Sequence, residues 1–498
     1  MKPIQIKICL KKTLFLIAVM TVAVLCIMDA ACESTGNQRS QCAIEGSIQD
    51  APGEAMRIAF GDALAGGCEL QDAPVYITPN GKSKAVADYF QPARSRSNVI
   101  KSEPINCTQD SLGICKAHEM NLSGEGVSIA LIDSEFYMDR LAEREMPRKM
   151  IKLYKASYSQ AERHGTACAE LIADIAPNVT LYLFGLEGAA SEEDFLEVIQ
   201  EISKLDRKID IVSCSSDFDV GLFDGEDKIC KAISNLTARG TIWINSAGSG
   251  GQSHWSGQFQ DADEDDFNEF AVDDETIEFA AERGDLITAT LSWNDSSSRA
   301  VNDFDLYIIA PDGSSAVSRY DQKGIYGQRP VEFAWKVANV NGNYSIKIKK
   351  YKSSGSNVTF QLLTSHDLGE HNVESCSLAI IASCPDVIAV GAVDWATMQI
   401  ESFSPRGPTI DGRIKPDLVA PTNVTTSSYL PDMFNGTSSS APYVAAMMAL
   451  VMEKYGKSGM TDRDMLQLLL DNALDLGPPG VDNTYGYGLA NVKFLNKL

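Results

Sequence analysis

The sequence predicts an α/β fold, in which a parallel β-sheet flanked by helices is interrupted by an inserted antiparallel β-sandwich or jelly roll. Three observations lead to this prediction. Short apolar runs with many β-branched residues alternate with amphipathic stretches, which is typical of parallel sheets with crossover helices. Residues 254–370 instead alternate apolar and polar residues between turn signals, which indicates antiparallel strands. Apolar runs and helical periodicity return after residue 370.

The chain begins with the pattern of a secretory signal peptide over residues 1–31. Four lysines precede a 16-residue apolar run, and the small residues Ala30 and Ala31 follow. We therefore expect a secreted, periplasmic or cell-surface protein with no stable membrane insertion after cleavage. An uncleaved anchor is the alternative, because the run of 16 residues approaches the roughly 17 that span a bilayer. Lipid attachment at Cys32 is a third possibility, which Asp29 disfavours.

The core α/β domain is expected in two parts, 111–253 and 371–498, and residues 32–110 form an N-terminal extension. Apolar runs predict its buried strands, and capped or amphipathic stretches predict its helices. The strands are expected at 127–133, 178–185, 209–216, 241–248 and 387–393, and the helices at 164–175, 191–205, 225–240, 441–451 and 461–477. Within the insert, the strand pattern occurs at 274–282, 285–293, 303–313, 331–337, 343–351 and 357–364.

The composition is strongly acidic, with a formal net charge of −24 over 498 residues. Such a charge disfavours nucleic-acid binding, keeps an exported protein soluble and can attract cationic peptides or Ca²⁺. The densest acidic run is DADEDD at 261–266, whose oxygens are ligands that calcium accepts, although the spacing fits no EF-hand loop. We favour a solvated linker over a calcium site, so calcium binding stays open.

Twelve cysteines in an exported chain predict disulfides. Pairs that are close in the sequence are the candidates, because they would close short loops. They are Cys107 with Cys115 and Cys376 with Cys384, while Cys42 with Cys68 could cross-link the N-terminal region.

The stretch NGTSSSAPYVAAMMALV places Ser438 between a tight turn at Gly436 and a helix. The unpaired N–H groups and positive dipole end of a helix favour a developing oxyanion, and Pro442 is tolerated in a first helical turn. The serine is therefore either a helix cap or a nucleophile. Taken alone, the segment favours the cap.

Two other segments favour the nucleophile. VSIALID ends a buried strand at Asp133, where a carboxylate can be buried and oriented. RHGTACAELIADI places His164, one of only five histidines, at the start of a helix directly before Gly165 and Thr166. A histidine in this place is harder to explain by packing alone.

The segments IDS, HGTACA and NGTSSSAP resemble the Asp, His and Ser motifs of the subtilisin-like serine proteases, in the same chain order. Asp133 and His164 are 31 residues apart, close to the roughly 30 of subtilisin. His164 and Ser438 lie about 115 residues farther apart than the roughly 160 of subtilisin, which locates the insert between them. The resemblance also implies that residues 32–110 are a propeptide, the alternative being an ordinary extension.

The resemblance implies an endopeptidase for protein or peptide substrates that requires no cofactor. Ser438 would be the nucleophile, His164 the general base, and Asp133 the group that orients the imidazole. Cys168, one helical turn after His164, would be a buried inert thiol. The implied oxyanion hole is formed by Ser438 and Ser249, and the implied substrate-binding residues are Ser215, Ser216, Asp217, Ser246, Ala247 and Gly248.

Three residues depart from the family pattern. Glu135 stands where glycine is usual, and a neighbouring carboxylate could raise the pKa of Asp133. Ser249 stands where asparagine is usual, and losing such a donor costs on the order of 10²–10³ in rate in subtilisin itself. Asp217 stands where glycine is frequent, which suggests either a preference for basic side chains or a blocked cleft. The alternative function is therefore a catalytically weak or inactive subtilase-like protein that binds a partner through its cleft and β-insert. We favour the enzyme, because all three triad residues stand within their motifs.

Overall fold

The computed structural model describes residues 75–77, 83–85 and 110–496, apart from 135, 137–144, 148, 154–162, 187–190, 219–220, 222, 224, 226 and 354–356. The chain divides into two compact units, Met1–Ala73 and Pro74–Leu498, and the described residues lie in the second. The predicted signal peptide and nearly all of the N-terminal extension lie outside the described residues. The described part of that extension is an antiparallel pair, β1 (Val75–Ile77) and β2 (Ser83–Ala85).

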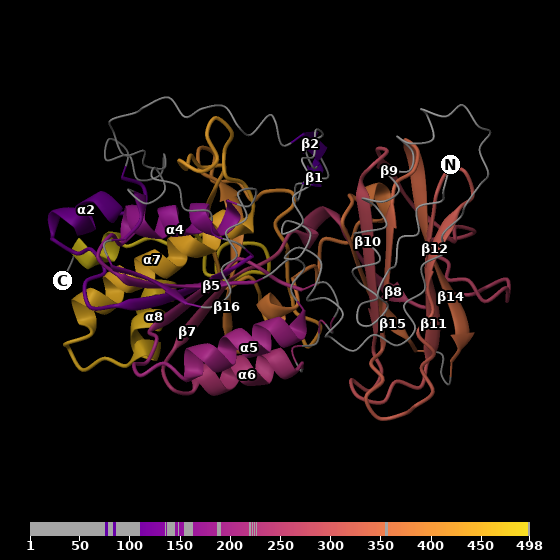
Figure 1. Cartoon of the computed structure of the whole chain (residues 1–498), viewed down its shortest axis with the longest axis horizontal. Coiled ribbons are helices and arrows are strands. Elements are labelled where there is room, and N and C mark those ends of the chain that lie inside the picture. The colour runs from indigo at the N-terminus through magenta and orange to yellow at the C-terminus, as the bar shows by residue number, and fades with distance from the viewer. Residues whose placement is uncertain are drawn as a thin grey trace, which may run out of the picture. The chain divides into compact units, whose positions relative to one another are not determined.

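A seven-stranded sheet forms the centre of the core domain (Figure 1). Its order is β17-β16-β7-β6-β3-β5-β4, and every neighbouring pair of strands is parallel. All residues of β3, β6, β7 and β17 are buried, as expected for strands covered on both faces. The strands are β3 (Ser128–Asp133), β4 (Lys149–Leu153), β5 (Thr180–Gly185), β6 (Ile211–Cys214), β7 (Ile242–Ser246), β16 (Val387–Asp394) and β17 (Leu418–Thr422).

The predicted parallel sheet with flanking helices is thus confirmed, and only its two edge strands were not predicted. Strand β17 contains Pro421, and a proline argues against a strand in a sequence reading. Strand β4, KMIKL, interrupts its apolar residues with lysines. Both segments are strands because they pair with a neighbouring strand, and their own sequences do not predict it.

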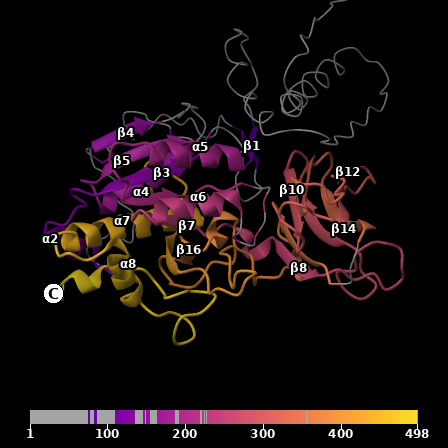
Figure 2. The same ribbon diagram turned by 90° about the horizontal axis from the view of Figure 1, so that it is seen from below.

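Helices cover both faces of the sheet (Figures 1 and 2). On one face, α4, α7 and α8 pack on the sheet in one apolar core, and on the other, α5 and α6 form a second core. Helices α5 and α8 begin with capping boxes at Ser191 and Thr461. The helices are α2 (Ile114–Glu119), α4 (His164–Ile175), α5 (Glu192–Ser203), α6 (Lys228–Thr237), α7 (Thr437–Tyr455) and α8 (Asp462–Asp471). Short 3₁₀ helices are η5 (Gly250–Gln252), η6 (Gly369–His371), η7 (Ile381–Ser383) and η8 (Lys493–Asn496).

The insert consists of two four-stranded antiparallel sheets, β13-β10-β15-β8 and β12-β11-β14-β9. Inward-facing residues of both sheets form one apolar core, which includes Trp255, Trp293, Phe304, Tyr344 and Phe360. This arrangement confirms the predicted β-sandwich, although β8 and β12 were not predicted. The strands are β8 (His254–Gln258), β9 (Ile277–Ala281), β10 (Leu286–Trp293), β11 (Asp303–Ile309), β12 (Ser315–Ser318), β13 (Val331–Val337), β14 (Gly342–Lys352) and β15 (Thr359–Thr364).

An arginine of the insert joins it to the core domain. Arg329 donates from Nη1 to Glu192 Oε2 at 3.2 Å and from Nη2 to Asp227 Oδ1 at 2.5 Å. Both carboxylates are buried, with side-chain exposures of 7% and 5%. Glu192 opens α5 and Asp227 is the N-cap residue of α6. One guanidinium is therefore shared by two buried carboxylates at the beginning of two helices.

Among the described helices, none combines the length and the apolar character that crossing a membrane requires.

The Arg329 contacts predict a strong effect of Arg329→Ala on stability. The substitution removes a cation that two buried carboxylates share, and breaking a buried ion pair costs roughly 3–5 kcal/mol. Arg319→Ala is the matched control, because Arg319 is 60% exposed and lies 3.6 Å from Asp305. Because the arginine of this pair lies mostly in solvent, the pair should contribute about 1 kcal/mol or less. Chemical denaturation measures the free energy of unfolding of both variants. An Arg329→Ala protein as stable as the Arg319→Ala control would show that the Arg329 ion pairs do not stabilise the fold.

Candidate functional site

Asp133 and His164 form a hydrogen-bonded pair at one edge of the parallel sheet. Asp133 is the last residue of β3 and His164 is the first residue of α4. His164 Nδ1 lies 2.7 Å from Asp133 Oδ1, and the side-chain exposures are 19% for His164 and 0% for Asp133. The same carboxylate oxygen accepts the backbone N–H of Ser134 at 2.8 Å. The structure thus joins two of the three predicted triad residues.

Two further side chains bound this pair. The ring of Phe434 meets His164 edge-on, with centroids 5.3 Å apart. The thiol of Cys168 lies beneath His164 and is fully buried, and burial together with the Asp133 charge raises its pKa well above the usual value. The structure therefore agrees with the expected buried inert thiol.

Ser438 occupies the second position of α7, and it does not cap the helix. The N-cap residue is Gly436, whose φ of 113° suits a glycine, and no side chain caps α7. Every other residue from Thr437 to Met452 is buried, so the fold exposes Ser438 alone on this stretch. Its hydroxyl donates to the backbone carbonyl of Ser215 at 3.3 Å. The helix-cap alternative for Ser438 is therefore wrong.

Pro442 explains how the backbone of Ser438 is held. We expected this proline in the first turn of the helix, but α7 begins at Thr437 and Pro442 lies in the second turn. Because proline has no N–H, the carbonyl of Ser438 four residues earlier lacks its helical donor. Ser215 Oγ at 3.1 Å and Cys168 Sγ at 3.4 Å supply the missing hydrogen bonds. Two side chains near the Asp–His pair thus hold the Ser438 backbone.

Ser438 and His164 lie in the same region of the fold. Cys168 links them, because it lies on the His164 helix and bonds to Ser438. A long contact between nucleophile and base is common before substrate binds. Turning the Ser438 hydroxyl away from Ser215 would free it for another acceptor.

The predicted oxyanion segment lies next to the start of α7. Thr437 Oγ1 donates to the Gly248 carbonyl at 2.7 Å, and Gly248 N–H donates to Thr437 Oγ1 at 3.2 Å. Ser249 follows this turn and is exposed. Thr437, the residue directly before Ser438, therefore holds the turn that precedes Ser249.

The predicted substrate-binding residues differ in their exposure to solvent. Ser215, Ser246 and Ala247 are buried, whereas Ser216, Asp217 and Gly248 are partly exposed. The Asp217 carboxylate accepts the backbone N–H groups of Phe218 at 2.8 Å and Ile381 at 3.3 Å. The carboxylate is therefore engaged by backbone amides of the protein itself.

The sequence reasoning did not single out Glu170, Phe434 or Thr437, which contact or support this region. Glu170 carries a detectable signal, since it is the only charged residue between His164 and Asp174 on an otherwise apolar helix. Glu135, which was expected to influence Asp133, lies outside the described residues.

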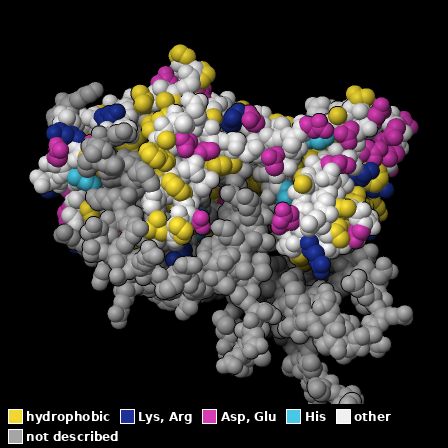
Figure 3. All heavy atoms as spheres, turned by 90° about the horizontal axis from the view of Figure 1, so that it is seen from above, with side chains coloured by type: hydrophobic (Ala, Val, Ile, Leu, Met, Phe, Trp, Pro, Cys, Tyr) yellow, Lys and Arg dark blue, Asp and Glu magenta, His cyan; other side chains and the backbone are white. Residues whose placement is uncertain are grey.

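Two groups of described side chains place potential metal-binding atoms within 4.8 Å of one another. The first is Asp133, His164 and Cys168, where the Asp–His hydrogen bond occupies the facing atoms. The second is Asp261, Asp263 and Asp265 in the acidic run. Lys350 Nζ lies 2.6 Å from Asp261 Oδ2 and 2.9 Å from Asp266 Oδ1, so an ammonium already provides positive charge there. Figure 3 shows acidic side chains gathered over the insert on that face.

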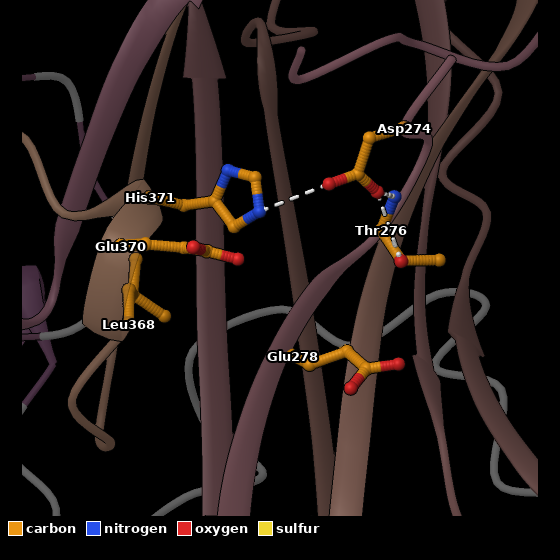
Figure 4. Close-up of a pocket in the computed structure, with 6 residues that line it drawn as sticks. All are labelled: Asp274, Thr276, Glu278, Leu368, Glu370 and His371. Atoms are coloured by element: carbon orange, nitrogen blue, oxygen red, sulfur yellow. Dashed lines mark hydrogen bonds and ion pairs between the residues drawn. The ribbon is translucent and has the colours of Figure 1, made fainter. Parts of the chain in front are cut away.

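A polar pocket of about 180 Å³ lies in the insert (Figure 4). His371 Nε2 lies 3.2 Å from Asp274 Oδ2, and the other Asp274 oxygen accepts the N–H and hydroxyl of Thr276. Its lining contains none of the predicted site residues, so it is separate from the Asp–His pair. The lining residues are Asp274, Thr276, Glu278, Leu368, Glu370 and His371.

The disulfide pairing corrects one expectation. Cys384 is bonded to Cys230, 154 residues earlier, with Cα atoms 5.2 Å apart, while Cys376 is a free thiol. The predicted bond between Cys376 and Cys384 is therefore wrong, because three-dimensional proximity and not sequence proximity decides the pairing. Cys115 is also disulfide-bonded, and its predicted partner Cys107 lies outside the described residues.

Peptide mapping of the non-reduced protein should recover Cys230 linked to Cys384. Brief alkylation of the native protein should modify Cys376, which is partly exposed, and spare Cys168, whose burial both shields it and raises its pKa. Cys168 should be alkylated after denaturation. A peptide linking Cys376 to Cys384, or rapid native labelling of Cys168, would contradict the structure.

Comparison with known proteins connects this geometry to one family. Residues 340–488 match the family described as the subtilase family. The minor extracellular protease Epr of Bacillus subtilis (strain 168) is 32% identical over 115 residues, which cover 22% of this chain and 16% of that protein. Pyrolysin of Pyrococcus furiosus is 34% identical over 112 residues, covering 20% of this chain and 8% of that protein. The chain therefore spans less than a fifth of the length of these curated relatives.

A solved structure shares the fold over a larger part of the chain. The CspB protease of Clostridium perfringens has a TM-score of 0.55 and 17% identity, covering 78% of this chain and 98% of that one. At this identity the likeness concerns the fold alone. Together with the match at residues 340–488, it confirms the predicted resemblance to the subtilisin-like serine proteases: this chain carries a subtilase-family segment on a subtilisin-like fold.

Proposed function

We propose that this chain is an exported serine endopeptidase that cleaves peptide bonds through an acyl-enzyme, with Asp133, His164 and Ser438 as its triad. The observation that carries the proposal is the 2.7 Å hydrogen bond between His164 Nδ1 and the fully buried Asp133 carboxylate. The exposure of Ser438 on an otherwise buried helical stretch supports it further. The subtilase-family segment supports peptidase chemistry in general.

Asp133 would prepare His164 for proton transfer. A carboxylate that accepts Nδ1–H holds the neutral imidazole in the tautomer whose Nε2 can accept a proton. When Nε2 is protonated, the buried carboxylate stabilises the resulting cation. Phe434, which meets the imidazole edge-on, limits its rotation.

In the proposed reaction, the Ser438 hydroxyl leaves the Ser215 carbonyl and turns to His164. Its oxygen attacks the substrate carbonyl carbon while Nε2 accepts the proton, giving a tetrahedral oxyanion. Cleavage of the C–N bond transfers that proton to the leaving amine and leaves an ester on Ser438. Water, deprotonated by His164, then hydrolyses the ester and restores the serine.

The oxyanion would be held at the beginning of α7. The N–H groups of the first helical turn have no helical acceptor, and the helix dipole adds positive potential there. The Ser438 N–H is one of these donors, and the Ser249 hydroxyl is the proposed second donor. Its exposed position after the fixed Gly248 turn supports this role.

Protein or peptide chains are the proposed substrates, with Ser215 to Asp217 and Ser246 to Gly248 as the binding segments. The Asp217 carboxylate is engaged by two backbone amides, which disfavours a role in selecting basic side chains. The proposed chemistry requires no cofactor, and the ion pairs of Lys350 favour a solvated acidic run over a calcium site. Export rests on the N-terminal sequence pattern.

A fluorophosphonate probe tests the nucleophile. The exported and processed protein should be labelled, and Ser438→Ala should abolish labelling because no activated hydroxyl remains. Ser440→Ala is the matched control: this neighbouring serine is buried and donates to the Ala420 carbonyl, so its loss should leave labelling intact. A folded, processed wild-type protein that takes no label would reject the proposal.

Substitutions at Ser249 test the second oxyanion donor. Ser249→Ala should lower kcat by up to roughly 10²–10³ with KM little changed, because this donor acts mainly on the transition state. Ser249→Asn should raise kcat above the wild-type value, since the longer amide side chain reaches farther. If kcat is the same in all three proteins, the hydroxyl does not contact the oxyanion.

A further inference from the structure

Glu170 is a buried carboxylate that bonds to a segment far away in the sequence. It lies on α4, six residues after His164, and is 4% exposed. Its Oε1 accepts the Ser428 hydroxyl at 2.6 Å, and its Oε2 accepts the Ser428 backbone N–H at 3.2 Å. Both oxygens therefore bind the same residue.

This carboxylate lies there at an electrostatic cost. The pKa of Glu170 is raised from 4.5 to about 7: burial is the largest cause, the charge of Glu145 adds to the rise, and the hydrogen bonds from Ser428 and Ser427 oppose it. Among the described residues, no lysine or arginine forms an ion pair with it. The guanidinium of Arg163 donates instead to the backbone carbonyl of Ser428 at 3.3 Å.

The segment that Glu170 holds leads directly to the proposed nucleophile. It runs from the end of β17 at Thr422 to the start of α7 at Thr437. Within it, Tyr429 packs on Phe434 with ring centroids 4.7 Å apart, and Phe434 packs edge-on against His164. Ser428 is thus bound by two residues of the His164 end of α4, Arg163 and Glu170, and the segment returns to touch His164 itself.

We propose that Glu170 is a positioning residue of the triad: it ties the helix bearing His164 to the segment that carries Phe434 and leads to Ser438. It touches neither substrate nor reacting atoms. Its effect passes through Ser428 to Phe434, which limits the rotation of the imidazole. This inference rests on the proposed peptidase function.

The ionised form of Glu170 should hold the segment more firmly than the neutral form. A carboxylate accepts both Ser428 donors in charge-assisted bonds, whereas the neutral acid must donate one proton itself. Because its pKa is raised in the folded state, its contribution to stability is present below about pH 4.5 and is lost as the pH rises through about 7. Ionisation of Glu170 between about pH 4.5 and 7 would therefore raise activity while it lowers the free energy of unfolding.

The pH dependence of kcat/KM in the full processed protein tests this role. In the wild type, the acid limb should report two ionisations, those of His164 and Glu170. Glu170→Gln keeps the shape and can still bond to Ser428, but it cannot ionise, so its acid limb should report one ionisation. Its thermal stability should also lose the decline between about pH 4.5 and 7. Glu170→Ala should lower kcat by up to roughly 10²-fold with KM nearly unchanged, because it misplaces the imidazole.

Glu453→Gln is the matched control. Glu453 also accepts two backbone N–H groups, those of Ser123 and Gly124, each at 2.6 Å, but it lies near the other end of α7. It should leave the shape of the acid limb unchanged. If Glu170→Gln also keeps the wild-type limb and kcat while the fluorophosphonate still labels Ser438, the positioning role is overturned and the peptidase stands. If the wild type takes no label, the peptidase proposal fails and this inference fails with it.

Discussion

The burial of the Asp133 carboxylate is the constraint on which the rest of the site depends. A carboxylate removed from water must be hydrogen-bonded or paired, and here His164 and Ser134 supply the bonds. That requirement fixes the start of α4 at the carboxyl end of β3, between β5 and β6. In open parallel sheets this edge is where binding sites form. The site therefore follows from the sheet order as much as from its own residues.

A second requirement arises from the carbonyl of Ser438, which Pro442 deprives of its helical donor. Ser215 follows β6 and Cys168 lies on α4, and both bond to that carbonyl. Three elements thus converge on one backbone atom at the beginning of α7. The backbone of Ser438 is therefore held by hydrogen bonds from side chains that lie outside α7.

The fold and the three triad candidates could be predicted because each has a local signature. Buried strands are apolar, and Asp133 and His164 stand where such elements end or begin. Glu170 could not be understood in this way, because Ser428 lies 258 residues further along the chain. The same reason explains the disulfide error: Cys384 was matched to its near neighbour, whereas packing of α6 brings Cys230 to it. Pro442 was misplaced by one turn because the helix begins at Thr437 and not nearer to Ala441.

The position of the insert also has a consequence for how the chain folds. Strands β7 and β16 are neighbours in the parallel sheet, where Asn245 pairs with Ala389, yet the whole insert separates them in the sequence. The first and last strands of the insert, β8 and β15, pair with each other, with Trp255 opposite Leu362. Once that pair has formed, the ends of the insert are adjacent, and only residues 247–253 and 365–386 remain to connect the insert to β7 and β16. Strands far apart in the sequence pair slowly because closing the long loop between them costs entropy, so we expect the central sheet to close faster once the sandwich has formed.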